Sequence, residues 1–119
     1  MDYEKICDEV LNCDNQIRYV GIYDYGELHD KMKSGISSYL TKEETEISLS
    51  HAVYRWSTRK KTSEKIGKPI FAMARYEKIY RLTIPIGGAG IILISAELTA
   101  NVNVIVDKVL AIQSKFSQN

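Results

Sequence analysis

Three glycines within four residues, in the stretch GGAG at residues 87–90, are the first feature that could do chemistry. Glycine-rich loops bind phosphate when they open into a helix, because glycine lets backbone N–H groups approach the anion and a helix N-terminus favours negative charge. Here the glycines lead into IILISAE at residues 91–97, an isoleucine-rich run typical of a strand. No Lys-Ser or Lys-Thr follows, and no glycine lies three residues beyond Gly90. We therefore interpret GGAG as a hairpin turn and expect no nucleotide cofactor.

The other residue types that commonly act in catalysis form no recognisable constellation. His29 and His51 are the only histidines, and neither has Cys, Asp or Glu at metal-binding spacing. We expect His29 to be exposed on a polar strand and His51 to lie beside the apolar face of a helix. Asp24 and Glu27 flank a turn, where paired carboxylates could do acid–base work, although such residues are commoner as turn formers. No serine lies in a G-x-S-x-G context, so we expect a non-enzymatic protein without metal or cofactor.

Composition and cysteine content indicate an ordinary globular protein. The 119 residues are 45% hydrophobic and 26% charged, which suits a single domain over residues 1–119 with its own core. No apolar run reaches the roughly 18 residues that a membrane span needs, and the acidic N-terminus does not resemble a secretory signal. Cys7 and Cys13 are too few for a zinc site or a disulfide framework. We expect both thiols to be reduced and the protein to be cytoplasmic.

The elements that must position any site follow from periodicity. Thr41 and Glu44 form a capping box at the start of a middle helix, which GKP at residues 67–69 ends. That helix carries one apolar face, formed by Leu49, Ala52, Val53 and Trp56. The other expected elements are helices at 2–13 and 99–116, a hairpin of strands at 17–24 and 27–32, and strands at 69–76, 79–86 and 91–98.

These elements predict an α+β fold. The order is α-β-β-α-β-β-β-α, which suits a five-stranded antiparallel sheet. The last strand is apolar at almost every position, so both of its faces should be buried. We therefore expect helices on both faces of the sheet, with the middle helix on one side and the two terminal helices on the other.

The order of elements resembles the roadblock/dynein light chain family, a branch of the profilin-like folds, over nearly the whole chain. VGIYDYGEL at residues 20–28 looks like the first hairpin of that family, RLTIPIGGAGIILISAE at 81–97 like its last hairpin, and TANVNVIVDKV at 99–109 like its closing helix. The middle helix is longer and more basic than this resemblance leads one to expect. The resemblance implies a dimeric scaffold that pairs through the middle helix and the strand after it. Many such proteins engage small GTPases or motor complexes.

Charge is unevenly distributed along the chain. Residues 1–50 hold 5 basic and 11 acidic side chains, a net charge of −6, whereas residues 51–119 hold 11 basic and 4 acidic, a net charge of +7. Nine of these basic residues lie between Arg55 and Arg81. The asymmetry marks either a partner-binding surface or a solvated helix that follows its own dipole. Because the overall net charge is only +1, we expect Arg55, Arg59 and Lys60 to face solvent or an acidic partner rather than nucleic acid. Since no segment is long enough to span a membrane, we expect no membrane partner either.

The strand PIFAMARY at residues 69–76 predicts a homodimer. Pro69 suits an edge strand, because proline cannot donate to a ladder. The apolar run after it carries one charge, Arg75, so an unpaired edge would be prone to association, and a two-fold axis lets it pair with its own copy. A different, related roadblock-like chain could fill the edge instead. The predicted interface consists of Trp56, Phe71, Ala72, Met73 and Ala74.

Two functions from different classes remain. The first is a non-enzymatic dimeric interaction module, a scaffold or regulator of a small GTPase. The alternative is a small-molecule sensor with a pocket between sheet and helix, because eight tyrosines are many for a chain of this length. Those that could line such a pocket are Tyr19, Tyr23, Tyr54, Tyr76 and Tyr80. Aromatic rings packed on the sheet with their hydroxyls at its edge explain the same residues without a ligand.

Overall fold

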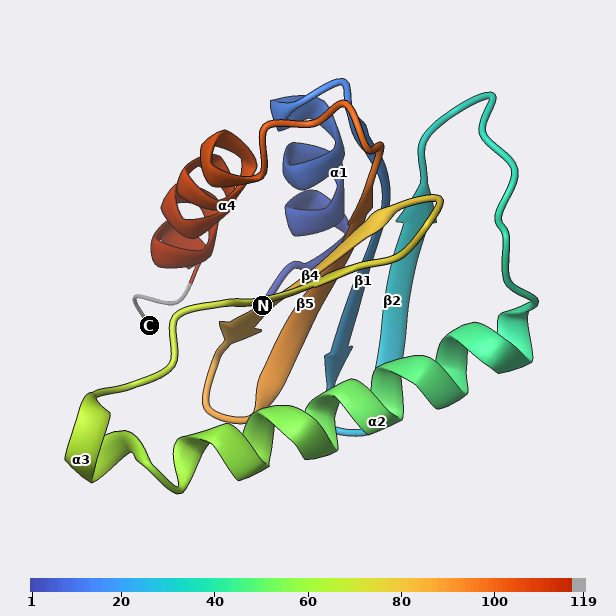
Figure 1. Cartoon of the computed structure of the whole chain (residues 1–119). Coiled ribbons are helices and arrows are strands. Elements are labelled where there is room, and N and C mark those ends of the chain that lie inside the picture. Colours follow the sequence, from blue (N-terminus) through green and yellow to red (C-terminus); the bar gives the residue numbers. More distant parts are fainter. Residues whose placement is uncertain (117–119) are drawn as a thin grey trace.

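The computed structural model describes residues 1–116 (Figure 1). The elements run in the predicted order, with one additional short helix. They are α1 (Tyr3–Cys13), β1 (Ile17–Asp24), β2 (Glu27–Met32), α2 (Lys42–Lys60), α3 (Ser63–Ile66), β3 (Ala72–Arg75), β4 (Tyr80–Ile86), β5 (Gly90–Ala96) and α4 (Val102–Phe116). Among these residues no helix has the length and apolarity needed to cross a membrane.

The five strands form one antiparallel sheet in the order β2-β1-β5-β4-β3. The helices α1 and α4 cover one face and α2 lies on the other (Figure 1). This arrangement confirms the predicted fold class. The two edge strands are β2 and β3, so the segment that follows α2 ends at the border of the sheet.

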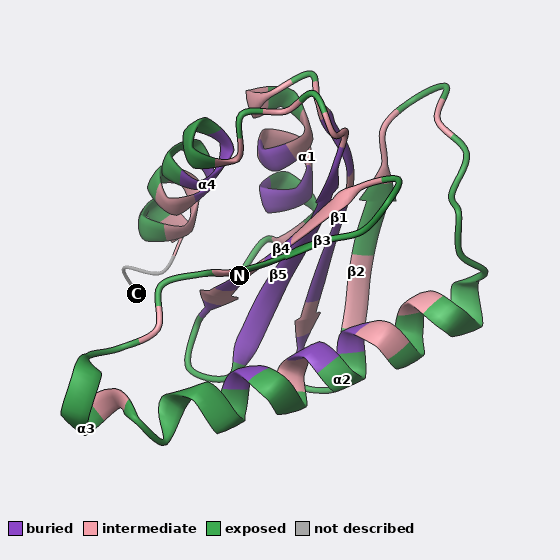
Figure 2. Ribbon diagram, viewed as in Figure 1, coloured by how far each residue is buried: buried purple, intermediate pink, exposed green. Residues whose placement is uncertain are grey.

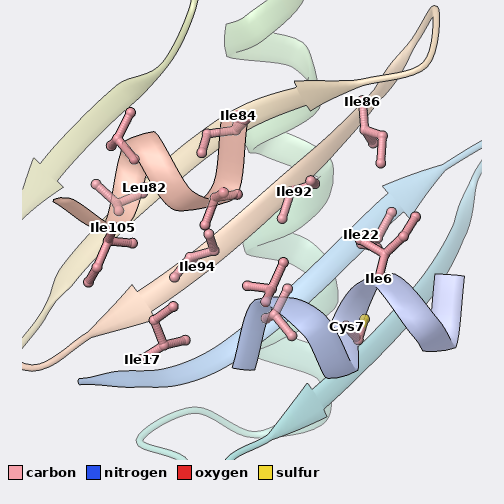
Figure 3. Close-up of a cluster of buried hydrophobic side chains, with 14 of the residues drawn as sticks. Ile6, Cys7, Ile17, Ile22, Leu82, Ile84, Ile86, Ile92, Ile94 and Ile105 are labelled. Carbon is pink, nitrogen blue, oxygen red and sulfur yellow. The ribbon is translucent and has the colours of Figure 1, made fainter. Parts of the chain in front are cut away.

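Two hydrophobic clusters hold the layers together, one on each face of the sheet. Alternation along β4 sends Leu82, Ile84 and Ile86 towards α1 and α4, where they join the larger cluster (Figure 3). The smaller cluster lies under α2 and consists of Leu49, Ala52, Trp56, Ile91 and Leu93. Because β5 contributes to both clusters, all of its residues are buried, as predicted (Figure 2).

The middle helix begins at the predicted capping box. The Glu44 N–H donates to Thr41 Oγ1 at 3.1 Å, and the Thr41 N–H donates to Glu44 Oε1 at 2.9 Å. The expectation of one helix reaching Gly67 is wrong, because α2 ends at Lys60 and the short α3 follows. The backbone tightens at this point. The Lys61 N–H donates to the Thr58 carbonyl at 3.2 Å and the Thr62 N–H donates to the Arg59 carbonyl at 3.4 Å, three residues back instead of four.

The strand predicted over residues 69–76 is shorter than expected. The strand β3 covers only Ala72–Arg75, so Phe71, predicted at the dimer interface, precedes the strand. The register pairs Ala72 with Thr83, so one more two-residue step would place Ile70 opposite Pro85. Because proline has no N–H to offer the ladder, pairing stops before that point.

Candidate functional site

The most exposed feature of the sheet is the outer edge of β3. This strand pairs with β4 on one side, and no described strand pairs with its other side. Met73 is 51% exposed there and Ala74 is exposed, whereas Ala72 packs partly against the cluster under α2. The edge therefore presents unpaired backbone groups flanked by small and apolar side chains, the arrangement that promotes strand addition.

A groove lies beside this edge, on the face of the sheet that α2 occupies. The helix packs over β1 and β5, which leaves the same face of β4 and β3 open along its flank. Two adjoining hollows follow this flank, one of them about 430 Å³ in volume. We call them together the arginine groove. The residues that characterise it are Arg55, Arg59, Ala72, Ala74, Tyr76 and Arg81.

The arginine groove is electropositive. Arg55, Arg59 and Arg81 form no ion pair with a carboxylate among residues 1–116. Arg81 Nη1 donates to Ser48 Oγ at 2.7 Å, which orients its guanidinium in the groove without neutralising it. An acidic surface would complement these three positive charges, because its carboxylates can accept hydrogen bonds from the guanidinium groups.

The helix beside the groove is polarised along its length. Its first turn carries Glu43 and Glu44, and its last turn carries Arg59 and Lys60. Acidic residues at the N-terminus and basic residues at the C-terminus both interact favourably with the helix dipole, so this charge distribution also stabilises the helix itself. The same polarity gives α2 an acidic half and a basic half, and both halves border the groove through Glu44 and Arg55.

The structure brings together only part of the predicted site. Arg55 and Arg59 lie in the groove with Ala72 and Ala74, as one surface. Lys60 lies elsewhere, since its ammonium group donates to the Gly88 carbonyl at the β4–β5 turn at 3.1 Å.

Trp56, expected to be an anchor of the core or of the dimer interface, lies in the core. It is 2% exposed and packs in the cluster under α2, so the chain's own sheet covers it. Helical periodicity placed Trp56 correctly on the apolar face, but it cannot say whether a sheet or a partner covers that face. Arg81 and Tyr76 are groove residues that the sequence prediction missed. The alternation of β4, which buries Leu82 on the opposite face, predicts which face of the sheet Arg81 lies on but not that α2 leaves this position open.

The cavity beside Tyr19 offers little room for the small-molecule ligand of the sensor alternative. The cavity between sheet and helix that the sensor alternative needs has a volume of about 40 Å³, beside Tyr19, Tyr39 and Arg18. That volume holds a few water molecules, whereas sites for small organic ligands typically occupy about 300–1,000 Å³. Tyr54 is 74% exposed on the outer side of α2. The predicted tyrosines therefore do not line one pocket.

Asp24 and Glu27 flank the β1–β2 turn and are paired in the register of the two strands. Asp24 is buried, and the Tyr3 hydroxyl donates to Asp24 Oδ2 at 2.5 Å. This hydrogen bond, together with burial, raises the pKa of Tyr3 to about 12. His29, expected to be exposed, is half-buried, because its ring stacks on Tyr3 with centroids 4.3 Å apart. The cluster fixes α1 to the β1–β2 hairpin and leaves the Asp24 and Glu27 carboxylates in different environments.

The two cysteines are both unpaired. Burial raises the pKa of Cys7 to about 11 and also raises the pKa of Cys13. Both thiols therefore stay protonated and unreactive at neutral pH. Within residues 1–116 no group of three or more His, Cys, Asp or Glu side chains is placed to hold a metal ion.

Comparison with known proteins identifies the fold. No family model and no curated protein matches the sequence. Among solved structures, the Roadblock/LC7 domain from Streptomyces avermitilis matches with a TM-score of 0.75 and 8% identity, over 97% of this chain and 94% of that one. Myxococcus xanthus MglB matches with a TM-score of 0.76 and 10% identity, over 99% and 94%. MglC from Myxococcus xanthus matches with a TM-score of 0.60 and 12% identity, over 97% and 96%. The chain has the Roadblock/LC7 fold.

Proposed function

We propose that the chain is a non-enzymatic interaction module that forms a homodimer through β3 and α2, and that the dimer binds and regulates a small GTPase in the cytoplasm. The observation that carries the dimer is the open edge of β3 beside a helix with oppositely charged halves. The unpaired thiols of Cys7 and Cys13 support a reducing compartment.

A two-fold axis beside the middle of β3 would pair the free backbone groups of this edge with those of a second copy. With the axis perpendicular to the sheet, the β3 strands of the two copies run antiparallel and continue one sheet across both molecules. The two α2 helices then lie on the same face of that sheet and also run antiparallel. The arginine grooves of the two copies then adjoin each other across the axis, in the space between the two helices.

The charges of α2 favour this arrangement. Antiparallel packing places the acidic first turns of one α2 alongside the basic last turns of the other. Glu44 of each copy then lies near Arg55 and Arg59 of the second copy, and both ion pairs occur twice because of the symmetry. A parallel arrangement would bring like charges together, at a cost in affinity.

The GTPase part of the proposal rests on the roadblock resemblance and on the surface that the dimer leaves exposed. The solvent-facing side of α2 carries two large apolar side chains, Ile47 at 57% and Tyr54 at 74% exposure, and Ile47 also borders the arginine groove. Two antiparallel helices would present Tyr54 of each copy on one platform, with Ile47 at its margin. Exposed aromatic and aliphatic side chains of this kind are common anchors in protein interfaces.

Light scattering on the purified protein tests the dimer. We expect a dimer at micromolar concentration, and Met73→Lys or Ala72→Asp should convert it into a folded monomer. A double-mutant cycle tests the geometry, because Glu44→Gln keeps a capping side chain while removing its charge. Glu44→Gln and Arg59→Gln should each weaken the dimer, with a coupling of about 1 kcal/mol between them. The matched control is Lys60→Gln, next to Arg59 but outside the groove, and it should leave dimer dissociation unchanged.

A wild-type protein that is monomeric at micromolar concentration would refute the dimer. A monomer that associates only with a different roadblock-fold chain would assign the edge to a heterodimer instead. Calorimetry with purified small GTPases, loaded with GDP or a non-hydrolysable GTP analogue, tests the partner. Tyr54→Ala should weaken binding at least tenfold, while Tyr25→Ala, an exposed tyrosine at the β1–β2 turn, should not. Absence of binding to every GTPase tested would refute this part and leave the dimer standing.

A further inference from the structure

The segment between α2 and β3 forms a projecting basic tip. We define the basic tip as residues 60–70, which begin at the last residue of α2 and contain α3, and α3 lies away from the α1 and α4 layer (Figure 1). The basic tip holds four lysines and one glutamate, a net charge of +3. The lysines are Lys60, Lys61, Lys65 and Lys68. None of them forms an ion pair with a carboxylate among the described residues.

The basic tip also exposes aliphatic side chains. Ile66 is 82% exposed and Ile70 is 55% exposed, and almost the whole tip is accessible to solvent (Figure 2). Neither isoleucine belongs to the two hydrophobic clusters. Exposed aliphatic side chains among lysines without a carboxylate partner do not stabilise the core. A surface of this kind is typical of a binding site.

We propose that the basic tip docks on the surface of an anionic lipid bilayer, with its lysines against the headgroups and Ile66 inserted at the acyl boundary. Lysine clusters are attracted to anionic leaflets, and an apolar side chain supplies the second signal that stable surface binding needs. Nucleic acid fits less well, because residues 60–70 contain no aromatic side chain to stack on a base. An aliphatic side chain also gains nothing from a phosphodiester backbone.

This proposal goes beyond the regulatory function and revises the expectation of no membrane partner. That expectation rested on the absence of a spanning segment, which surface docking does not need. If the homodimer forms as proposed, the two-fold axis keeps both α2 helices, and hence both tips, on one face of the dimer. A flat bilayer could then contact both tips at once, which would increase affinity through effective concentration.

Flotation with lipid vesicles tests the proposal on the full chain. We expect the protein to float with vesicles in which phosphatidylserine replaces part of the phosphatidylcholine, and not with phosphatidylcholine vesicles, at physiological salt. Changing Lys61, Lys65 and Lys68 together to glutamine should weaken partitioning about a hundredfold, or roughly fivefold per lysine. Ile66→Ser, which leaves the charge unchanged, should weaken it about tenfold. The matched control changes three lysines elsewhere on the surface to glutamine, namely Lys5, Lys42 and Lys78, and should alter partitioning less than twofold.

Several results would overturn the proposal. One is absence of flotation with the phosphatidylserine vesicles, and another is equal flotation with both lipids. An equal loss of vesicle partitioning in the control variant and the triple-lysine tip variant would show that only the net charge of the protein matters. A higher affinity for duplex DNA, RNA or polyglutamate than for vesicles, unchanged by Ile66→Ser, would assign the tip to a different partner. Light scattering without vesicles reports the homodimer separately, so a monomer that still floats would refute the dimer and support the tip.

Discussion

Replacing Trp56 with alanine measures how strongly α2 is fixed to the sheet. Trp56 is buried among Leu49, Ala52, Ile91 and Leu93, and among the described residues it is the one fully buried aromatic side chain of that cluster. Truncating a buried tryptophan typically costs about 3–5 kcal/mol. The indole Nε1 has no hydrogen-bond partner among residues 1–116, and an unsatisfied buried donor already costs about 1–3 kcal/mol. We therefore expect a loss near the lower end of the range, about 3 kcal/mol.

That loss corresponds to a measurable change in melting temperature. The unfolding entropy of globular proteins is about 2.1 cal/mol/K per residue, or roughly 0.25 kcal/mol/K for a chain of 119 residues. A loss of about 3 kcal/mol should lower Tm by roughly 12 °C. Thermal unfolding should be followed at one fixed protein concentration, because the stability of a dimer depends on concentration.

Two control variants separate packing from other effects. Trp56→Phe keeps an aromatic ring and removes the unpaired N–H, so it should cost less than half as much as Trp56→Ala. Tyr54→Ala changes an exposed aromatic residue of the same helix, and should alter stability by less than about 0.5 kcal/mol. An unchanged Tm for Trp56→Ala would refute the packing of α2 on the sheet. Equal losses for the phenylalanine and alanine variants would refute the argument from the indole N–H.

Two further changes test the contacts around Asp24. Gly90→Ala would place a Cβ 2.8 Å from Asp24 Oδ1 and 3.0 Å from the Ile86 carbonyl oxygen. We therefore expect the free energy of unfolding, measured in urea, to fall by about 1–3 kcal/mol. The control Gly88→Ala, whose Cβ would have no neighbour within 4 Å among the described residues, should leave this free energy unchanged. Because the pKa of Tyr3 is raised from 10.0 to about 12, its hydrogen bond stabilises the fold fully below pH 10, and this contribution is lost as the pH rises towards 12. Tyr3→Phe should therefore flatten the alkaline fall in stability between these values, and a wild-type-like fall in that variant would contradict the assignment.

Local patterns determined most of the fold. Thr41 and Glu44 are three residues apart, so their capping box is visible in the sequence and marks the start of α2 correctly. The alternation of Leu82 and Ile84 with Arg81 likewise predicts both faces of β4. The length of β3 was not predictable in this way, because it depends on Pro85 lying opposite Ile70. That relation exists only once the register of two strands is known.

The candidate site was predictable only in part, for the same reason. Arg55 and Arg59 stand out as charges on a helix, but their neighbours in the groove come from β3 and β4. Arg81 is a groove residue because α2 leaves the flank of β4 open, and no local pattern encodes where a helix lies on a sheet. The burial of Asp24 depends similarly on Tyr3, which another element contributes.

The centre of the sheet has a consequence for how the chain folds. Its two middle strands come from opposite ends of the chain, with Ile17 paired to Ala96, while the hairpins β1–β2, β3–β4 and β4–β5 are local. The hairpins can form early, but joining β1 to β5 closes a loop of roughly 80 residues, so this step should limit the folding rate. Doubling the length of that loop would add only about 0.6 kcal/mol to the closure cost. Evolution can therefore lengthen or replace the segment that carries α2 and α3 while the central strand pair, and with it the fold, persists.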